Sequence, residues 1–184
     1  MKSIFAIIAS LLLYNVSHSQ SLGVSIGLFE TSNYSNTGYG LIVEYDKTIS
    51  SDYELTILSS ILYNSDTYSI GKLEYFQIPI NMGIRYYLFT STINPYVSLE
   101  GGISYLNTDQ ISTTIITTRT GTEVRTDEIF QHTRITLGIG TSIGSIVRLN
   151  DNLDISINAK FHLSTDSYAN YLLVNGGIKL RIWA

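Results

Sequence analysis

The stretch from Phe76 to Tyr105 most constrains the fold, because apolar and polar residues alternate along nearly all of it. The apolar residues take the even positions from Phe76 to Leu88 and the odd positions from Val97 to Tyr105. A period of two indicates strands, since successive side chains point to opposite faces. Two such strands joined by about five polar residues predict a hairpin. Strands this long are typical of barrels that cross a membrane.

The composition favours an all-β protein of one domain. The 184 residues include 14 Tyr, 14 Gly and only two Pro, and charged residues make up 14% of the chain. A net charge of −4 offers no basic surface for nucleic acid. The absence of Cys excludes disulfides, thiolate metal sites, a cysteine nucleophile and a lipidated N-terminal cysteine.

The N-terminus has the pattern of an export signal. Lys2 precedes an apolar run from Ile4 to Leu13, and Ser17–Ser19 supplies small residues for cleavage. The run is shorter than the ~20 residues of a spanning helix. We therefore expect residues 1–19 to be a signal peptide and residues 20–184 to be an outer-membrane β-barrel domain. No later apolar run reaches spanning length, so a mature chain in a membrane must cross it as a barrel.

Eight alternating segments can be counted after the predicted cleavage site. Longer polar loops follow the odd-numbered segments and tight turns follow the even-numbered ones, as in outer-membrane barrels. An even count allows the first and last strands to pair. We predict an all-β fold, an eight-stranded antiparallel transmembrane up-and-down β-barrel. The segments are 22–29, 38–47, 53–63, 76–88, 97–105, 129–147, 153–163 and 171–183.

Two connections between these segments have distinct sequence patterns. Residues 64–67 read as a polar loop. The longest connection, from Asn107 to Asp127, contains Ile115, Ile116 and Val124, which would extend the flanking strands beyond the membrane as a hairpin.

The polar face of the strands is expected to line the lumen. Eight strands leave just enough room for side chains, and an unpaired charge inside would be costly. We therefore predict a plugged lumen with a paired charge network, with Asp154 near Lys179 or Arg181. An ion or proton path is the alternative. Leu58 and Leu62 interrupt the polar face. The predicted network is Glu44, Asp46, Glu54, Arg85, Glu100, Arg134, Asp154, Lys160, Lys179 and Arg181.

Aromatic residues recur at the ends of the apolar face. Tyr53 and Tyr63 lie ten residues apart, as do Phe76 and Tyr86. At ~3.3 Å per residue and a tilt of about 40°, that separation spans about 25 Å, the height of the apolar band between two aromatic girdles. The predicted girdle residues are Tyr39, Tyr45, Tyr53, Tyr63, Phe76, Tyr86, Tyr105 and Trp183.

Two segments resemble a hairpin of the small outer-membrane β-barrel family that includes PorT-like and OmpX/OmpA-type proteins. They read QIPINMGIRYYLF, from Gln77, and NPYVSLEGGISYL, from Asn94. The final strand, NGGIKLRIW, resembles the C-terminal signal read by the barrel assembly machinery, although Ala184 follows Trp183 where an aromatic commonly ends the chain. The resemblance implies an outer-membrane barrel and says little about function.

Catalytic chemistry has little support in the sequence. His162 and Ser164 resemble the His-x-Ser pair of outer-membrane lipid A deacylases, but strand parity points His162 into the lumen and no acid completes a triad. His132 and His162 make a weak metal pair without a third ligand. We predict no catalytic residue, no metal site and no cofactor.

The sequence thus favours a non-enzymatic outer-membrane protein of a Gram-negative bacterium, structural or adhesive, acting through its extracellular loops. The expected partners are outer-membrane lipid and lipopolysaccharide, the barrel assembly machinery during biogenesis, and an extracellular protein or surface. Two alternatives stay open. One is a lipid A-modifying, deacylase-like enzyme, and the other is a soluble lipocalin-like carrier, which needs its apolar face inside.

Overall fold

The computed structural model describes residues 19–32, 36–68, 71–89, 91–117 and 123–183. The predicted signal peptide lies outside these residues, apart from Ser19. Among the described residues, no helix is long and apolar enough to cross a membrane.

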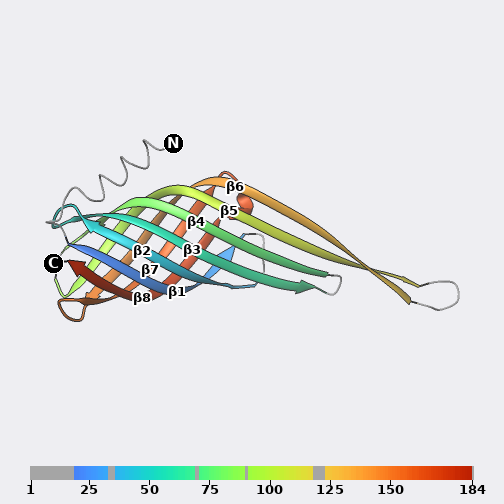
Figure 1. Cartoon of the computed structure of the whole chain (residues 1–184), viewed down its shortest axis with the longest axis horizontal. Helices are drawn as coiled ribbons and strands as arrows, with labels where there is room; N and C mark the ends of the chain where they lie inside the picture. Colours follow the sequence, from blue (N-terminus) through green and yellow to red (C-terminus); the bar gives the residue numbers. More distant parts are fainter. Residues whose placement is uncertain (1–18, 33–35, 69–70, 90, 118–122, 184) are drawn as a thin grey trace.

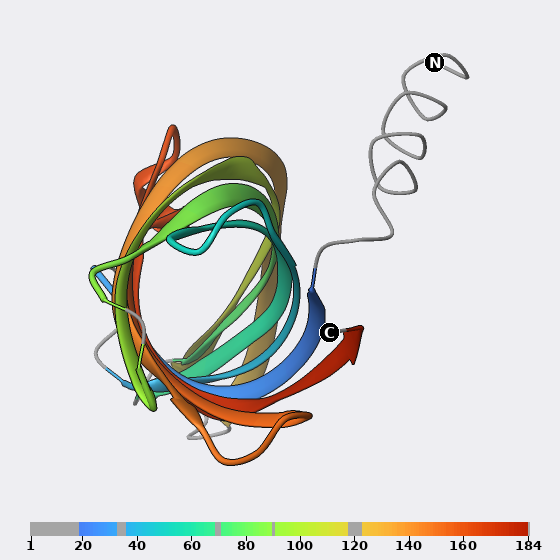
Figure 2. The same cartoon turned by 90° about the vertical axis from the view of Figure 1, so that its left-hand side faces the viewer.

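Eight antiparallel strands form one closed barrel, in which each strand pairs with the next and β1 pairs with β8 (Figures 1 and 2). The predicted fold class, an eight-stranded antiparallel all-β barrel, is confirmed. A single 3₁₀ turn, η1 (Ser167–Ala169), lies between the last two strands. The strands are β1 (Gln20–Thr31), β2 (Gly38–Thr48), β3 (Tyr53–Tyr68), β4 (Gly71–Tyr87), β5 (Ile93–Thr117), β6 (Glu123–Arg148), β7 (Leu153–Ser164) and β8 (Tyr171–Trp183).

The predicted loop at residues 64–67 is wrong, because these residues continue β3. Asn64 pairs with Tyr75 and Tyr68 pairs with Gly71, so β3 and β4 form a hairpin longer than expected. Polar residues on both faces concealed this strand. The inward residues Asn64 and Asp66 are buried, but the apolar alternation is lost because the outward residues Ser65 and Thr67 are polar too.

The predicted extension of the fifth and sixth strands is present. Their pairing continues to Thr117 and Glu123, whereas β4 reaches only Ser112 of β5 and β7 reaches only Gly138 of β6. The two strands therefore run on as a ribbon well past the rest of the barrel (Figure 1). We call β5 from Asn107 and β6 up to Thr133 the projecting hairpin.

Along each strand, aliphatic side chains point outward and polar ones inward. Ile80, Leu137 and Ile157 are 50%, 61% and 60% exposed, whereas Arg85 and Glu100 are buried. The apolar face thus forms the outside of the barrel, the reverse of a water-soluble core.

Two adjacent glycines on β5 have opposite surroundings. A Cβ on Gly102 would lie 2.0 Å from the Ile80 carbonyl oxygen and 2.5 Å from Asn81 Oδ1. A Cβ on Gly101 would meet nothing closer than the Gly138 carbonyl oxygen at 3.8 Å. Of the two, only Gly102 is therefore required for close approach of the inner side chains.

We predict that Gly102→Ala lowers the free energy of unfolding by about 1–3 kcal/mol, because the added methyl group would overpack the wall beside Asn81. Urea unfolding of the barrel in detergent measures the change. Gly101→Ala is the matched control and should change the free energy by less than ~0.5 kcal/mol. Equal losses in both variants would contradict this assignment.

Candidate functional site

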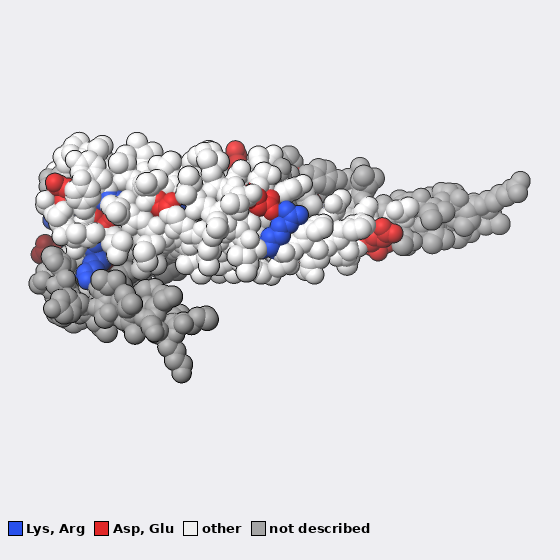
Figure 3. Space-filling model, turned by 90° about the horizontal axis from the view of Figure 1, so that it is seen from above, with Lys and Arg blue, Asp and Glu red and all other residues white. Residues whose placement is uncertain are grey.

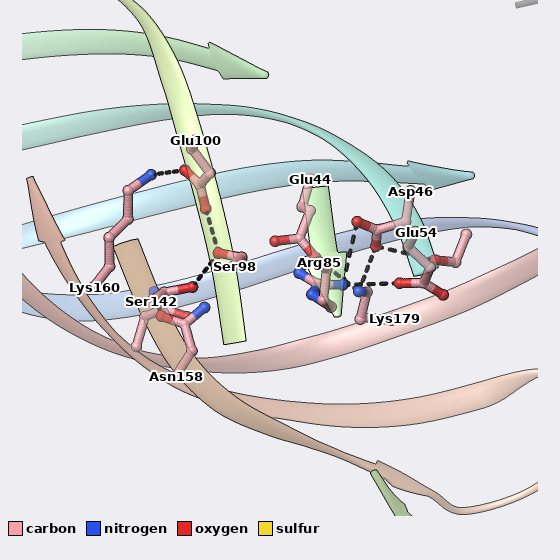
Figure 4. A network of polar contacts seen from close by, with 12 residues as sticks. Glu44, Asp46, Glu54, Arg85, Ser98, Glu100, Ser142, Asn158, Lys160 and Lys179 are labelled. Atoms are coloured by element: carbon pink, nitrogen blue, oxygen red, sulfur yellow. Dashed lines mark hydrogen bonds and ion pairs between the residues drawn. The ribbon is translucent and has the colours of Figure 1, made fainter. Parts of the chain in front are cut away.

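The most distinctive site is a buried charge cluster in the half of the lumen nearest the short turns. It consists of Glu44 and Asp46 from β2, Glu54 from β3, Arg85 from β4 and Lys179 from β8 (Figure 4). Because β8 is joined to β2 only through β1, Lys179 meets the residues of the early strands as a result of barrel closure.

Arg85 is the centre of the charge cluster. Its Nη2 lies 2.8 Å from Glu44 Oε1, and its Nη1 lies 3.1 Å from Glu54 Oε2 and 3.3 Å from Asp46 Oδ1. Lys179 Nζ lies 2.7 Å from Glu44 Oε1 and also pairs with Asp46. Each base thus bridges at least two acids, which offsets the cost of removing these charges from water.

Neutral groups orient the charges. The Tyr87 hydroxyl donates to Glu54 Oε2 at 2.6 Å, and the Ser21 hydroxyl donates to Asp46 Oδ2 at 3.2 Å. The Arg85 guanidinium also lies over the Tyr96 ring, 4.3 Å from its centroid. A cation over an aromatic face gains electrostatic attraction, most strongly where water is excluded.

Two further ion pairs lie in the lumen. Arg181 donates to both carboxylate oxygens of Asp154, at 2.6 Å and 3.1 Å, so of the two expected partners for this acid the structure selects Arg181. Lys160 pairs with Glu100, whose Oε1 accepts from Ser98 at 3.1 Å. Each of these pairs is balanced, with one charge of each sign.

Arg134 does not join the lumenal network. Its side chain is 50% exposed and donates to Asp166 in the connection between β7 and β8. Strand parity predicted that Arg134 points inward. However, β7 ends opposite Gly138, so no β7 residue pairs with β6 at the level of Arg134 and the barrel is not closed there. Partial burial alone would raise the pKa of Asp166, but hydrogen bonds from Arg134 and the Tyr168 N–H outweigh it and hold that pKa below its ordinary value.

The other end of the lumen holds a cluster of buried apolar side chains, which the strand pattern did not predict. Aliphatic and aromatic side chains pack together there with Ala169 from η1, beside buried polar groups such as Gln77, and we call the apolar set the apolar plug. Its sequence signal was the presence of single apolar residues such as Leu62 on the polar face of the strands. The apolar plug is Phe29, Ile42, Leu62, Tyr75, Leu106, Ala169, Tyr171 and Leu173.

His162 lies inside the barrel, as strand parity predicted. Its side chain is fully buried and stacks on Tyr171, with ring centroids 4.7 Å apart. Ser164 Oγ donates to the Leu137 carbonyl oxygen instead of to His162, and His132 is exposed on the projecting hairpin. This arrangement lacks the lipid-facing His-Ser pair that a deacylase needs. Within the described part of the chain, no three His, Asp or Glu residues are grouped to hold a metal ion.

A cavity of about 570 Å³ opens at the short-turn end, and we call it the vestibule. Hydroxyl-bearing side chains form much of its wall, and Glu54 and Lys179 of the charge cluster lie at its inner end. Asp154, Arg181 and Arg148 also line it. The charge cluster is therefore reached from the short-turn side, whereas the apolar plug separates it from the loop side.

The predicted girdle residues divide into rows on adjacent strands. Tyr63 pairs with both Tyr39 and Phe76 at the loop end, and Tyr53 pairs with Tyr86 at the turn end, with ring centroids 5.0 Å apart. Tyr105 is exposed, and Tyr45 is half-buried opposite Ile57. The side chain of Trp183 lies outside the described residues.

Solved structures with the same fold are small outer-membrane barrels. Neisserial surface protein A aligns with a TM-score of 0.61 at 12% identity, covering 90% of this chain and 97% of that one. Ail of Yersinia pestis aligns with a TM-score of 0.53 at 10% identity, covering 89% of this chain and 95% of that one. A major outer membrane protein of Thermus thermophilus aligns with a TM-score of 0.53 at 11% identity, covering 90% of this chain and 100% of that one.

No protein-family model and no curated protein matches this chain. The structural likeness therefore establishes the fold alone. The narrower resemblance to PorT-like and OmpX/OmpA-type proteins stays a prediction.

We predict that Lys160→Met lowers the free energy of unfolding by about 3–5 kcal/mol, because it leaves the Glu100 carboxylate buried without its counter-charge. The double variant Lys160→Met/Glu100→Gln should regain most of that loss, since it buries no charge. Urea unfolding in lipid vesicles gives both values. A double variant as unstable as the single one would show that the loss comes from packing.

Proposed function

We propose that this chain is a non-enzymatic protein of the Gram-negative outer membrane. Its barrel spans the bilayer with the short turns toward the periplasm and the loops outside. The closed lumen serves as a structural core, and the projecting hairpin presents a binding surface for an extracellular protein. Outer-membrane lipid and lipopolysaccharide would surround the wall, and the barrel assembly machinery would recognise β8.

The observation that carries the membrane assignment is the contrast between wall and lumen. Exposed aliphatic side chains follow one another along every strand, reaching 78% exposure at Ile135, while the charge cluster is buried. Neutral side chains cover most of the barrel wall visible in Figure 3. A surface of this kind is stable against acyl chains and would drive aggregation in water.

The two alternative functions are less well supported. A lipocalin-like carrier needs its apolar face inside, and here Ile80, Leu137 and Ile157 point out. A deacylase needs a reactive pair facing lipid, and His162 is buried against Tyr171.

The projecting hairpin is the best candidate for partner binding. Among the described residues, β6 pairs with β7 only from Gly138 onward, so the outer edge of its projecting part presents a row of backbone donors and acceptors. Such an edge accepts an extended peptide by strand addition. Ile129 and Phe130, 69% and 49% exposed on opposite faces of β6, would supply apolar contacts.

The charge of the hairpin favours a protein partner over a polyanion. Ail, an attachment invasion locus protein, has been crystallised with the heparin analogue sucrose octasulfate. On this chain the sequence of residues 107–133 carries more acid than base, which would repel sulfate groups. The acids are Asp109, Glu123, Asp127 and Glu128, and the bases are Arg119 and Arg125. We therefore expect an extended protein segment that carries basic residues.

We predict that Ile139→Lys destabilises the barrel in lipid by about 2–4 kcal/mol, because the ammonium group would enter the bilayer interior. Ile129→Lys, ten residues along the same outward row, should cost less than ~1 kcal/mol, because it lies on the projecting hairpin in water. Reversible urea unfolding in phospholipid vesicles, monitored by heat-modifiability, measures both. Equal costs would contradict a bilayer around residue 139.

We also predict that shortening the projecting hairpin abolishes partner binding and leaves the barrel intact. Residues 109–131 are replaced by Asn-Gly, which forms a two-residue turn between Thr108 and its partner His132. Bacteria that display the shortened and full-length proteins at equal levels are compared for adhesion to immobilised extracellular-matrix proteins. Adhesion that survives the deletion, with the heat-modifiable band unchanged, would refute a binding role for the hairpin.

A further inference from the structure

The charge cluster contains more acid than base. Three carboxylates, from Glu44, Asp46 and Glu54, face two cations, from Arg85 and Lys179. The side chains of Asp46, Lys179 and Arg85 are 1%, 2% and 3% exposed, and those of Glu44 and Glu54 are 13% and 16% exposed. With every group ionised, the cluster would carry one uncompensated negative charge.

The other described charges near the cluster do not supply the balance. Asp154 and Arg181 neutralise each other, and so do Glu100 and Lys160. Arg148 stands at the exposed rim of the vestibule, where water and salt screen it.

The remaining groups around the cluster leave this count unchanged. Lys47 follows Asp46 directly on β2, so strand alternation directs its side chain to the opposite face of the sheet, where it is buried. The groups that contact the cluster from β1, β4 and β5 are neutral. They are Ser21, Tyr87 and Tyr96.

Within the cluster, the carboxylates of Asp46 and Glu54 are the groups that can bind a further cation. Arg85 Nη1 touches both carboxylates, so they meet at a single nitrogen. Asp46 Oδ1 is buried and accepts no hydrogen bond from the described residues, although it lies 3.3 Å from that nitrogen. Figure 4 shows both acids pointing toward Arg85 and Lys179.

An entry path leads to the same place. Glu54 and Lys179 line the inner end of the vestibule, whose walls carry hydroxyl groups that can hold water. A small cation can thus reach the carboxylates from the short-turn side without crossing the apolar plug.

We propose that the charge cluster binds one additional monovalent cation, held by the carboxylates of Asp46 and Glu54. The ion is a proton or an alkali cation taken from the vestibule. In the first case a proton bonds to one carboxylate oxygen and makes that group a neutral acid. In the second the ion is held between the two carboxylates, and no covalent bond changes.

The test compares Glu54→Gln with Asp154→Asn in the full mature barrel in detergent. Both replacements are nearly isosteric and lie in the same vestibule, but the first removes the surplus charge and the second breaks a balanced pair. We expect Glu54→Gln to melt no lower than the unmodified barrel at pH 8, and Asp154→Asn to melt at least ~3 °C lower. Asp46→Asn, a second way of removing the surplus, should resemble Glu54→Gln.

The dependence on pH and on sodium identifies the ion. If the folded cluster holds a proton that the unfolded chain has released, stability falls as pH rises from about 5 to about 8 in choline chloride. If it holds an alkali ion, sodium chloride in place of choline chloride raises the melting temperature at pH 8 in a saturable way. Either dependence should be present in the unmodified barrel and in Asp154→Asn, and absent from Glu54→Gln.

Two results would overturn the proposal. One is a melting profile of Glu54→Gln with the same dependence on pH and sodium as the unmodified barrel. The other is a destabilisation of both Glu54→Gln and Asp46→Asn as large as that of Asp154→Asn. Because none of these measurements involves the loops or a partner, failure here would leave the proposed binding role of the hairpin untouched.

Discussion

The structure depends on the pairing of β1 with β8. In a hydrocarbon environment, a strand edge with unpaired N–H and C=O groups would cost several kcal/mol per group, so a sheet is stable there only when closed. The ladder between Thr31 and Tyr171 at one end and Gln20 and Trp183 at the other provides that closure. It also brings Lys179 of the last strand against Glu44 and Asp46 of the second, so the charge cluster is a direct product of closure.

Closure imposes different requirements on the residues of the two faces of the sheet. The outer face needs only to be apolar, and nearly any aliphatic residue satisfies it. The inner face must fill a narrow volume and satisfy each polar group it contains, so its residues are specific. Gly102 makes room for Asn81, and the carboxylates are matched to particular bases. Mutational sensitivity should therefore be concentrated on the inner face.

This difference explains what could be predicted from the sequence. Strict alternation identified the eight strands, and for β8 it gave the observed bounds of Tyr171 and Trp183. It failed at Asn64 to Thr67, where the strand leaves the apolar environment and alternation is no longer required. Strand parity correctly predicted that Arg85 and Lys160 point into the lumen, but it misplaced Arg134. Parity gives the direction of a side chain and does not show how far along β6 the neighbouring strand β7 extends.

The apolar plug was missed for another reason. Its members come from six strands and a 3₁₀ turn, and all but one of these strands contribute only a single residue to it, so no strand shows the cluster by its own pattern. Only the three-dimensional register shows that Phe29, Tyr75 and Tyr171 converge, with the Phe29 ring centroid 5.7 Å and 6.5 Å from those of the two tyrosines.

The plug and the charge cluster together give the lumen a polarity along the barrel axis. Buried apolar side chains obstruct the lumen at the loop end, while the hydroxyl-lined vestibule opens it at the other end. A surplus negative charge is tolerable only where a counter-ion can arrive, and here it lies beside the vestibule and away from the plug. The charge cluster thus lies toward the open end of the barrel, and the projecting hairpin lies on the far side of the plug, so the binding proposed for the hairpin would not disturb the cluster.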